Sequence, residues 1–316
     1  MLGLGLAAAY AHAMYRDPSE WKKIHDWLVG DATQPLELAG ETDTVVKEQA
    51  ERVNGNLGKL RAELDAYGPS AMVVLVSDTG RLFSGVQVPQ FSTFLGDSLW
   101  GSTRIEGMGE PAGDDIVELS CDPDLAAFVH EELVAAGFDM SYSKELNPQG
   151  EPEYGMPASL VTLVRALNPS FNLPVVPILV NSHVPPSPSG RRCRELGEAL
   201  GRILDEPEQR IALVASGGLS HDHHGPRAGW IDFPFDEWAL KQISRGRGGN
   251  LDRIWDLESD SIHGGTAEVR LWAVVAGACE SLGGKAVVDD YLPAYTAATG
   301  LGFAHWPLYQ RLGSAV

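Results

Sequence analysis

The chain has 316 residues, of which 44% are hydrophobic and 21% charged, and its formal net charge at pH 7 is −19. These values are typical of a soluble globular protein with a large core. The excess of carboxylates argues against binding to nucleic acid or to an anionic membrane surface, because both need clustered Lys and Arg. Three widely spaced cysteines, Cys121, Cys193 and Cys279, form neither a disulfide framework nor a zinc-binding spacing, so we expect a cytoplasmic protein.

The predicted elements alternate between strands and helices along the chain. Apolar runs predict strands at 2–9, 71–76, 173–180 and 210–215, and helical spacing predicts helices at 17–28, 42–67, 125–136, 193–204, 235–244 and 266–282. The first run imitates a short signal peptide, but no positive charge precedes it, so we expect a core strand there. No apolar run is long enough to span a membrane.

This order predicts a single α/β domain over 1–316. We expect a mixed, mostly parallel sheet flanked by helices, with the active site at the carboxyl ends of the strands. The Gly- and Pro-rich segments 101–124 and 142–158 are expected as long loops, of the kind that often form lids or partner surfaces.

The segment Ser216–Gly229, SGGLSHDHHGPRAG, directly follows the strand predicted at 210–215. Gly217 and Gly218 allow a sharp turn or a close approach to a ligand, so His221 is expected at the edge of the sheet, held by rigid scaffold. A glycine turn with a surface cluster of histidines is the alternative interpretation.

The order of motifs resembles the class III extradiol ring-cleavage dioxygenases, in particular the beta (catalytic) subunits of protocatechuate 4,5-dioxygenase. The motifs are an N-terminal Gly-Leu strand, VLVSD at 74–78, PQF at 89–91, VNSHVPPSPSGRRC at 180–193, SGGLSHDHHGPRAG at 216–229 and TAEVRLW at 266–272. The resemblance implies ring cleavage of a catecholic or hydroxylated aromatic carboxylate, with Fe(II) held by two histidines and one glutamate. It also implies an oligomer, either a homodimer or a pairing with a small alpha-type subunit.

Carried over residue by residue, the resemblance assigns the acid/base role to His221 and the iron-binding glutamate to Glu268. The positions of the two iron histidines read Tyr10 and Thr79 here, and a further active-site histidine reads Tyr154. A threonine hydroxyl and a neutral tyrosine are poor Fe(II) ligands, so either the iron site is changed or no cofactor is used. His12 lies two residues beyond Tyr10 and is the candidate replacement ligand beside Glu268.

Several other polar residues are candidates for substrate contact, each with a structural alternative. His183 follows the strand predicted at 173–180, and His223 neighbours His221; either is otherwise an ordinary structural or solvated histidine. Arg227 could bind a carboxylate bidentately or hold backbone carbonyls. Thr79 is a further substrate contact, Tyr10 and Tyr154 could donate hydrogen bonds to a phenolate, and Glu268 could instead be an exposed helix carboxylate.

Three functions are therefore compatible with the sequence. The first is an aromatic ring-cleaving dioxygenase with an altered iron site. The second is an iron-independent lyase, hydrolase, decarboxylase or isomerase acting on a phenolic or keto–enol substrate through His221. The third is a non-catalytic subunit that pairs with an active homologue, against which the retained His221 and Glu268 argue.

Overall fold

The computed structural model describes residues 1–256 and 259–312. Its strands are β1 (Leu2–Ala8), β2 (Ala71–Val76), β3 (Phe91–Phe94), β4 (Ser98–Gly101), β5 (Val117–Ser120), β6 (Met140–Ser143), β7 (Val175–Val180), β8 (Ile211–Ser216), β9 (Val287–Ala294) and β10 (Thr299–Trp306). Its α-helices are α1 (Pro18–Val29), α2 (Asp43–Tyr67), α3 (Pro123–Ala135), α4 (Ala158–Leu167), α5 (Gly190–Asp205), α6 (Phe233–Ser244), α7 (Val269–Ser281) and α8 (Tyr309–Leu312).

Eight strands form one mixed sheet in the order β6-β3-β7-β2-β8-β1-β10-β9, and β4 and β5 form a separate hairpin. The central four strands, β7, β2, β8 and β1, are parallel neighbours. Ala8 of β1 and Val76 of β2 both pair with Ser216 of β8, so these three strands end at the same level. The register therefore brings their following residues to one edge, as the sequence predicted for the active site.

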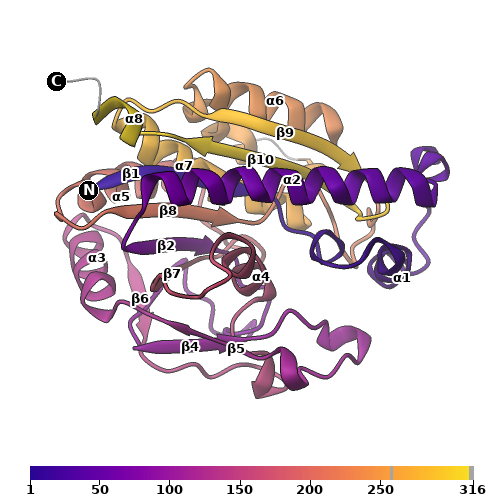
Figure 1. Cartoon of the computed structure of the whole chain (residues 1–316), viewed down its shortest axis with the longest axis horizontal. Coiled ribbons are helices and arrows are strands. Elements are labelled where there is room, and N and C mark those ends of the chain that lie inside the picture. Colours follow the sequence, from indigo (N-terminus) through magenta and orange to yellow (C-terminus); the bar gives the residue numbers. More distant parts are fainter. Residues whose placement is uncertain (257–258, 313–316) are drawn as a thin grey trace.

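Helices cover both faces of the sheet, and alternate strand residues point to opposite cores. In β2, Ala71, Val73 and Leu75 join one core with α3, α5 and α7, whereas Met72, Val74 and Val76 join the other with α1, α2 and α4. Figure 1 shows α2 crossing the near face of the sheet with α7 behind it. Burial on both faces explains why the parallel strands read as continuous apolar runs.

The structure confirms the predicted α/β class and the ten predicted elements, with ends shifted by a few residues. The first apolar run is a buried core strand, β1, as predicted. The two expected loops are partly wrong, because β5 lies inside 101–124 and β6 ends inside 142–158. The short strands β3–β6, the antiparallel pair β9–β10 and helix α4 were not predicted. Strands β3–β6 have only four residues each and β10 is interrupted by Gly, so these strands depend on pairing with their neighbours.

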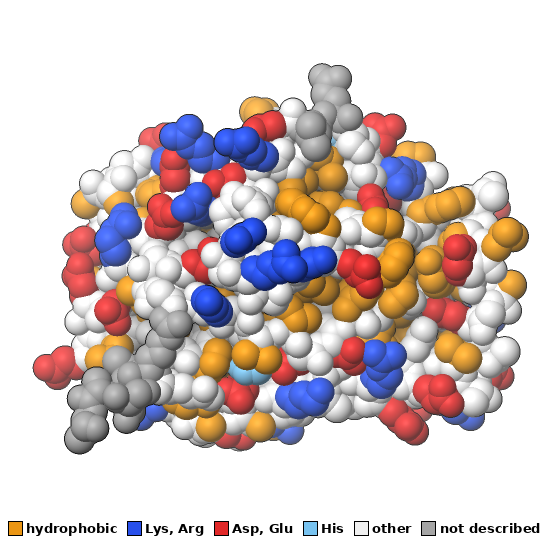
Figure 2. Space-filling model, turned by 90° about the horizontal axis from the view of Figure 1, so that it is seen from above, with side chains coloured by type: hydrophobic (Ala, Val, Ile, Leu, Met, Phe, Trp, Pro, Cys, Tyr) orange, Lys and Arg blue, Asp and Glu red, His pale blue; other side chains and the backbone are white. Residues whose placement is uncertain are grey.

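The face seen in Figure 2 shows basic and acidic side chains interspersed with apolar ones. Across residues 1–256 and 259–312, no helix has both the length and the apolar character needed to cross a bilayer.

Gly197 sets how closely α5 packs against α7. A Cβ added at Gly197 would lie 2.1 Å from the carbonyl oxygen of Val274, whereas one added at Gly58, on the exposed side of α2, would meet nothing within 4 Å. Ala is normally better than Gly inside a helix by about 0.5–1 kcal/mol. At Gly197 the overlap with backbone outweighs that gain, because the two helices must move apart.

We therefore expect Gly197→Ala to lower the free energy of unfolding by about 1–3 kcal/mol. The matched control Gly58→Ala should raise it by about 0.5–1 kcal/mol. Urea denaturation followed by circular dichroism measures both values. Equal effects of the two substitutions would contradict the close packing of α5 on α7.

Candidate active site

Four strand ends carry polar side chains into one cavity. Tyr10 follows β1, Thr79 follows β2, His183 follows β7 and His221 follows β8. These residues, with Glu268 immediately before α7, line a cavity of about 620 Å³. That volume is typical of small-molecule sites. Ligand sites of α/β proteins usually lie at this edge of the sheet.

His221 lines the cavity and is held rigidly by hydrogen bonds. Its N–H donates to Oγ1 of Thr266 at 3.1 Å, and its carbonyl accepts from the N–H of Thr266 at 3.0 Å. Its Nδ1 lies 2.9 Å from the carbonyl oxygen of Leu219, which can only accept, so Nδ1 carries the proton and Nε2 is free to act as a base. Burial lowers the pKa of His221, although the Glu268 carboxylate opposes this shift. The ring is therefore neutral at pH 7.

Glu268 connects the end of β7 to the end of β8. Its Oε1 lies 2.9 Å from Nε2 of His183, and its Oε2 accepts the N–H of Gly218 at 2.9 Å and lies 4.0 Å from Nε2 of His221. Burial alone would raise the pKa of Glu268, but the hydrogen bond to His183, the neighbouring imidazoles and the Gly218 N–H together lower it. The residue is 5% exposed, so Glu268 is a buried, ionised carboxylate and not an exposed helix residue.

The glycines of the strand-end turn make room for this carboxylate. Gly217 has φ of +150°, and a Cβ there would lie 2.7 Å from Oε2 of Glu268. A side chain at Gly217 would therefore displace Glu268 from the end of β8, which gives a physical reason for glycine at this position.

Three more histidines line the cavity around aromatic side chains. The ring of His223 lies 4.4 Å from that of His221, and its Nε2 is 3.0 Å from Oγ1 of Thr299. Nδ1 of His12 lies 2.8 Å from the hydroxyl of Tyr10. The Trp27 ring contacts both His12, at 5.7 Å, and the exposed His224, at 4.5 Å between centroids.

Burial keeps two of these rings neutral. It lowers the pKa of His12 to about 4, with the Arg16 guanidinium and nearby histidines adding to the effect. It lowers the pKa of His223 well below the ordinary value, again with nearby histidines contributing. Burial also raises the pKa of Tyr10, so that hydroxyl keeps its proton.

The other predicted site residues differ in their placement. Tyr154 lines the cavity, but its hydroxyl donates to the carbonyl of Glu110 and its ring lies under the Arg81 guanidinium, 5.3 Å from the centroid. Arg227 lies outside the cavity, beside a much smaller pocket, and its N–H donates to Asp222. A role for Arg227 in binding substrate stays a prediction.

Two arginines line the cavity that the sequence interpretation did not include. Arg81 lies five residues past the end of β2, and its place just after a strand end is a signal that could have identified it. Arg104 belongs to the segment expected as a loop, where no periodicity marks individual residues. Only the folding of that segment against Arg16 and against Arg165 of α4 brings it to the cavity.

The side chains present do not fit the iron arrangement that the resemblance implies. In residues 1–256 and 259–312, no group of three His, Cys, Asp or Glu side chains is arranged to hold a metal ion. Tyr10 and Thr79 occupy the two strand ends where histidine ligands are implied. His12, the candidate replacement, is hydrogen-bonded to Tyr10, and Glu268 is engaged by His183. Fe(II) favours imidazole and carboxylate ligands together, so this donor set would hold it weakly.

The fold and the cavity define an α/β protein with a cavity lined by His and Glu side chains at the carboxyl edge of its sheet. Comparison with known families matches residues 41–303 to the catalytic LigB subunit of aromatic ring-opening dioxygenase. The chain belongs to this family, which confirms the resemblance to extradiol dioxygenases.

Several curated relatives are named as 2,3-dihydroxyphenylpropionate/2,3-dihydroxicinnamic acid 1,2-dioxygenases. One from Dechloromonas aromatica (strain RCB) is 30% identical over 186 residues, which cover 58% of this chain and 54% of the relative. One from Escherichia coli (strain 55989 / EAEC) is 28% identical over 195 residues, covering 62% and 57%. One from Paraburkholderia xenovorans (strain LB400) is 32% identical over 162 residues, covering 51% and 46%. The chain thus spans about half the length of the curated relatives that it matches.

A solved structure supports the fold alone. The uncharacterized protein JW3007 from Escherichia coli K12 matches with a TM-score of 0.50 and 18% sequence identity, covering 78% of this chain and 91% of that one.

The lowered pKa of His12 predicts that the free energy of unfolding depends on pH. In the unfolded chain a histidine titrates near about 6.5, whereas the folded pKa of His12 is about 4. Between these pH values the unfolded state binds a proton that the folded state does not, so the free energy of unfolding rises with pH. The contribution of the neutral His12 ring to the free energy of unfolding is fully present above pH 6.5 and is lost as the pH falls toward 4. This contribution amounts to at most about 3 kcal/mol.

We expect His12→Gln to flatten the rise in the free energy of unfolding between pH 4 and 6.5, measured by urea denaturation at several pH values. Comparison at pH 8 separates this effect from the lost contact with Tyr10. If the free energy of unfolding of the variant rises with pH as steeply as that of the wild type, His12 is not held neutral in the folded protein.

Proposed function

We propose that the chain is an enzyme that acts on a phenolic or catecholic aromatic carboxylate, or on a keto–enol compound of that class, by acid–base chemistry through His221. The observation that carries the proposal is the position of Nε2 of His221, an unprotonated nitrogen of a cavity-lining residue that lies 4.0 Å from the Glu268 carboxylate. Family membership supports the substrate class. The apolar lining, which includes Trp27, Phe83 and Met156, suits an aromatic ring.

The proposed step is a proton transfer. Nε2 of His221 takes the hydroxyl proton of the bound substrate, which leaves a phenolate or enolate and an imidazolium. The Glu268 carboxylate stabilises the imidazolium, because the two charges are opposite and share a buried site. Return of the proton to a ring or chain carbon gives the keto tautomer, so atoms and charge balance without a further reactant. A positioned acid–base group typically contributes about 10²–10⁴-fold in rate.

Tyr10 and Thr79 have supporting parts in this proposal. Tyr10 keeps its proton, since burial raises its pKa, so it can donate a hydrogen bond to a substrate oxygen. Thr79 lines the same cavity at the end of β2 and offers a second hydroxyl. His183 orients Glu268 through their 2.9 Å contact.

Ring cleavage by a dioxygenase is the second candidate, favoured by the family match and by the names of the curated relatives. That reaction needs Fe(II), for which the donor set around Glu268 is poor. A purely structural subunit is less consistent with the ordered His183, Glu268 and His221, since pairing with another chain needs none of them.

The experiment that tests the proposal measures whether the activity depends on a metal ion and whether it depends on His221. Purified protein is incubated with 3,4-dihydroxybenzoate, with 2,3-dihydroxyphenylpropionate and with keto–enol aromatic acids in D2O. Deuterium incorporation is followed by NMR, oxygen uptake by electrode and iron by elemental analysis. We expect chelator-resistant deuterium exchange that falls at least about 100-fold in His221→Ala.

His130→Asn is the matched control, because it removes an imidazole that lies on α3, outside the cavity. It should retain the wild-type rate. Stoichiometric iron together with oxygen uptake that a chelator abolishes would overturn the iron-independent reaction in favour of ring cleavage. Exchange that survives His221→Ala would remove His221 from the mechanism.

A further inference from the structure

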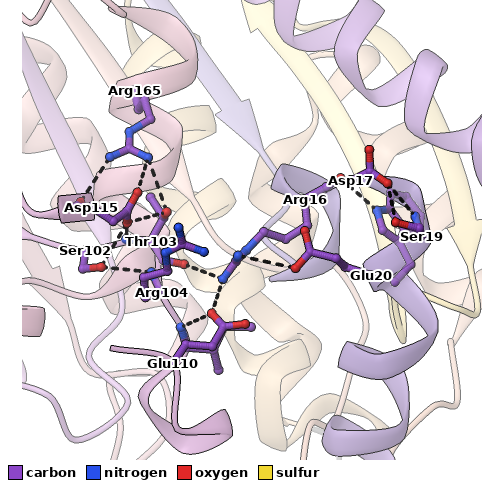
Figure 3. Close-up of polar contacts among 12 residues, drawn as sticks. Arg16, Asp17, Ser19, Glu20, Ser102, Thr103, Arg104, Glu110, Asp115 and Arg165 are labelled. Atoms are coloured by element: carbon purple, nitrogen blue, oxygen red, sulfur yellow. Dashed lines mark hydrogen bonds and ion pairs between the residues drawn. The ribbon is translucent and has the colours of Figure 1, made fainter. Parts of the chain in front are cut away.

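The segment 102–105 at the wall of the cavity is fixed by the half-buried carboxylate of Asp115. Asp115 accepts hydrogen bonds from the N–H and Oγ1 of Thr103, both at 2.7 Å, and from Oγ of Ser102 at 3.0 Å. Arg165, on α4, adds a contact of 2.8 Å. Burial opposes ionisation of Asp115, but these donors lower its pKa to about 2. Figure 3 shows this network beside Arg104.

A second network holds the same segment from the other side. Glu110 accepts the N–H of Ile105 at 3.0 Å and forms an ion pair with Arg16. Arg16 also lies 3.7 Å from Glu20, on α1 (Figure 3). The backbone on both sides of Arg104 is therefore anchored, which presents its side chain from a preorganised position.

Every other arginine of this region is neutralised by a carboxylate. Arg16 pairs with Glu110, and Arg165 pairs with Asp115. Arg81 pairs with Glu106 and also donates to the carbonyl of Gln149. The positive charges of these three arginines are thus balanced by carboxylates of the protein itself.

Arg104 differs from its neighbours. It is exposed, it lines the cavity, and its guanidinium has no hydrogen-bond or ion-pair partner in residues 1–256 and 259–312. Its charge acts on Glu110 only through space. Arg81 and Arg104 are the two Lys or Arg side chains among the described cavity-lining residues, and Arg81 is already paired.

Two carboxylates, those of Glu106 and Glu268, also line the cavity. The protein as a whole carries a formal charge of −19, which repels anions. Among the described residues, Arg104 is therefore the unpaired guanidinium that an anionic ligand would meet in this cavity.

We propose that Arg104 is the residue that binds the carboxylate of the substrate and thereby makes the enzyme specific for aromatic acids. A guanidinium can receive a carboxylate through two parallel hydrogen bonds, which adds orientation to affinity. The carboxylate then lies at the 102–105 segment, and the ring extends between the apolar side chains toward His221. This assignment rests on the proposed function and replaces the predicted role of Arg227, which lies outside the cavity.

The test compares an acid with its ester. Dissociation constants of 3,4-dihydroxybenzoate and its methyl ester are measured by calorimetry for the wild type and for Arg104→Gln, Arg104→Lys, Arg227→Gln and Arg245→Gln. Arg245 is exposed just after α6 and is the control for loss of one positive charge. We expect the wild type to prefer the acid and Arg104→Gln to lose at least about tenfold in acid affinity, with ester affinity unchanged within twofold.

Arg104→Lys should give an intermediate value, because it keeps the charge but not the paired donors. Arg227→Gln and Arg245→Gln should behave like the wild type. An acid preference that persists in Arg104→Gln, or an equal loss for acid and ester, would overturn the assignment while leaving the proposed function intact. Failure of the wild type to bind either compound would contradict the proposed function itself, and the assignment with it.

Discussion

The burial of one ionised carboxylate is the constraint on which the site depends. Glu268 lies where β7, β8 and α7 meet, and it is 5% exposed. A buried charge is tolerated only when donors surround it, and here His183 and the Gly218 N–H, each at 2.9 Å, provide them. Glycine at Gly217 follows from the same requirement, because a side chain there would displace the carboxylate.

In the proposed function, proton transfer and charge recognition are carried out by different side chains of the cavity. Burial holds His221, His12 and His223 in their neutral forms, which suits a base that must accept a proton near pH 7. Neutral imidazoles cannot attract a carboxylate strongly, and we propose that the Arg104 guanidinium at the wall binds it instead. Two ionised carboxylates, Asp115 and Glu110, anchor the backbone around Arg104 without touching its guanidinium. Burial thus keeps these histidines neutral, and pairing with carboxylates neutralises the other arginines, whereas Arg104 keeps an unpaired charge.

Most long helices and strands could be predicted from the sequence, whereas the short ones could not. Helix α2 and strands β2 and β8 have periodic or continuous apolar patterns long enough to be recognised alone. Strands of four residues, such as β3 and β5, carry too few side chains for a pattern, and they exist because a neighbouring strand accepts their hydrogen bonds. The same limit applied to the site: His221 and Glu268 belong to specific motifs, whereas Arg104 belongs to a segment without periodicity.

The sequence by itself determined the α/β class, the parallel core and the residues that follow its strands, because these depend on local apolar patterns and on the Gly-Gly turn before His221. Family membership also followed from motif order alone. Only the tertiary structure decided which polar residues share a cavity. It joined His183 to Glu268 across 85 residues, engaged Tyr154 with a backbone carbonyl, left Arg227 outside and brought Arg104 in. Distances between groups remote in sequence depend on how helices and strands pack, and no local pattern records them.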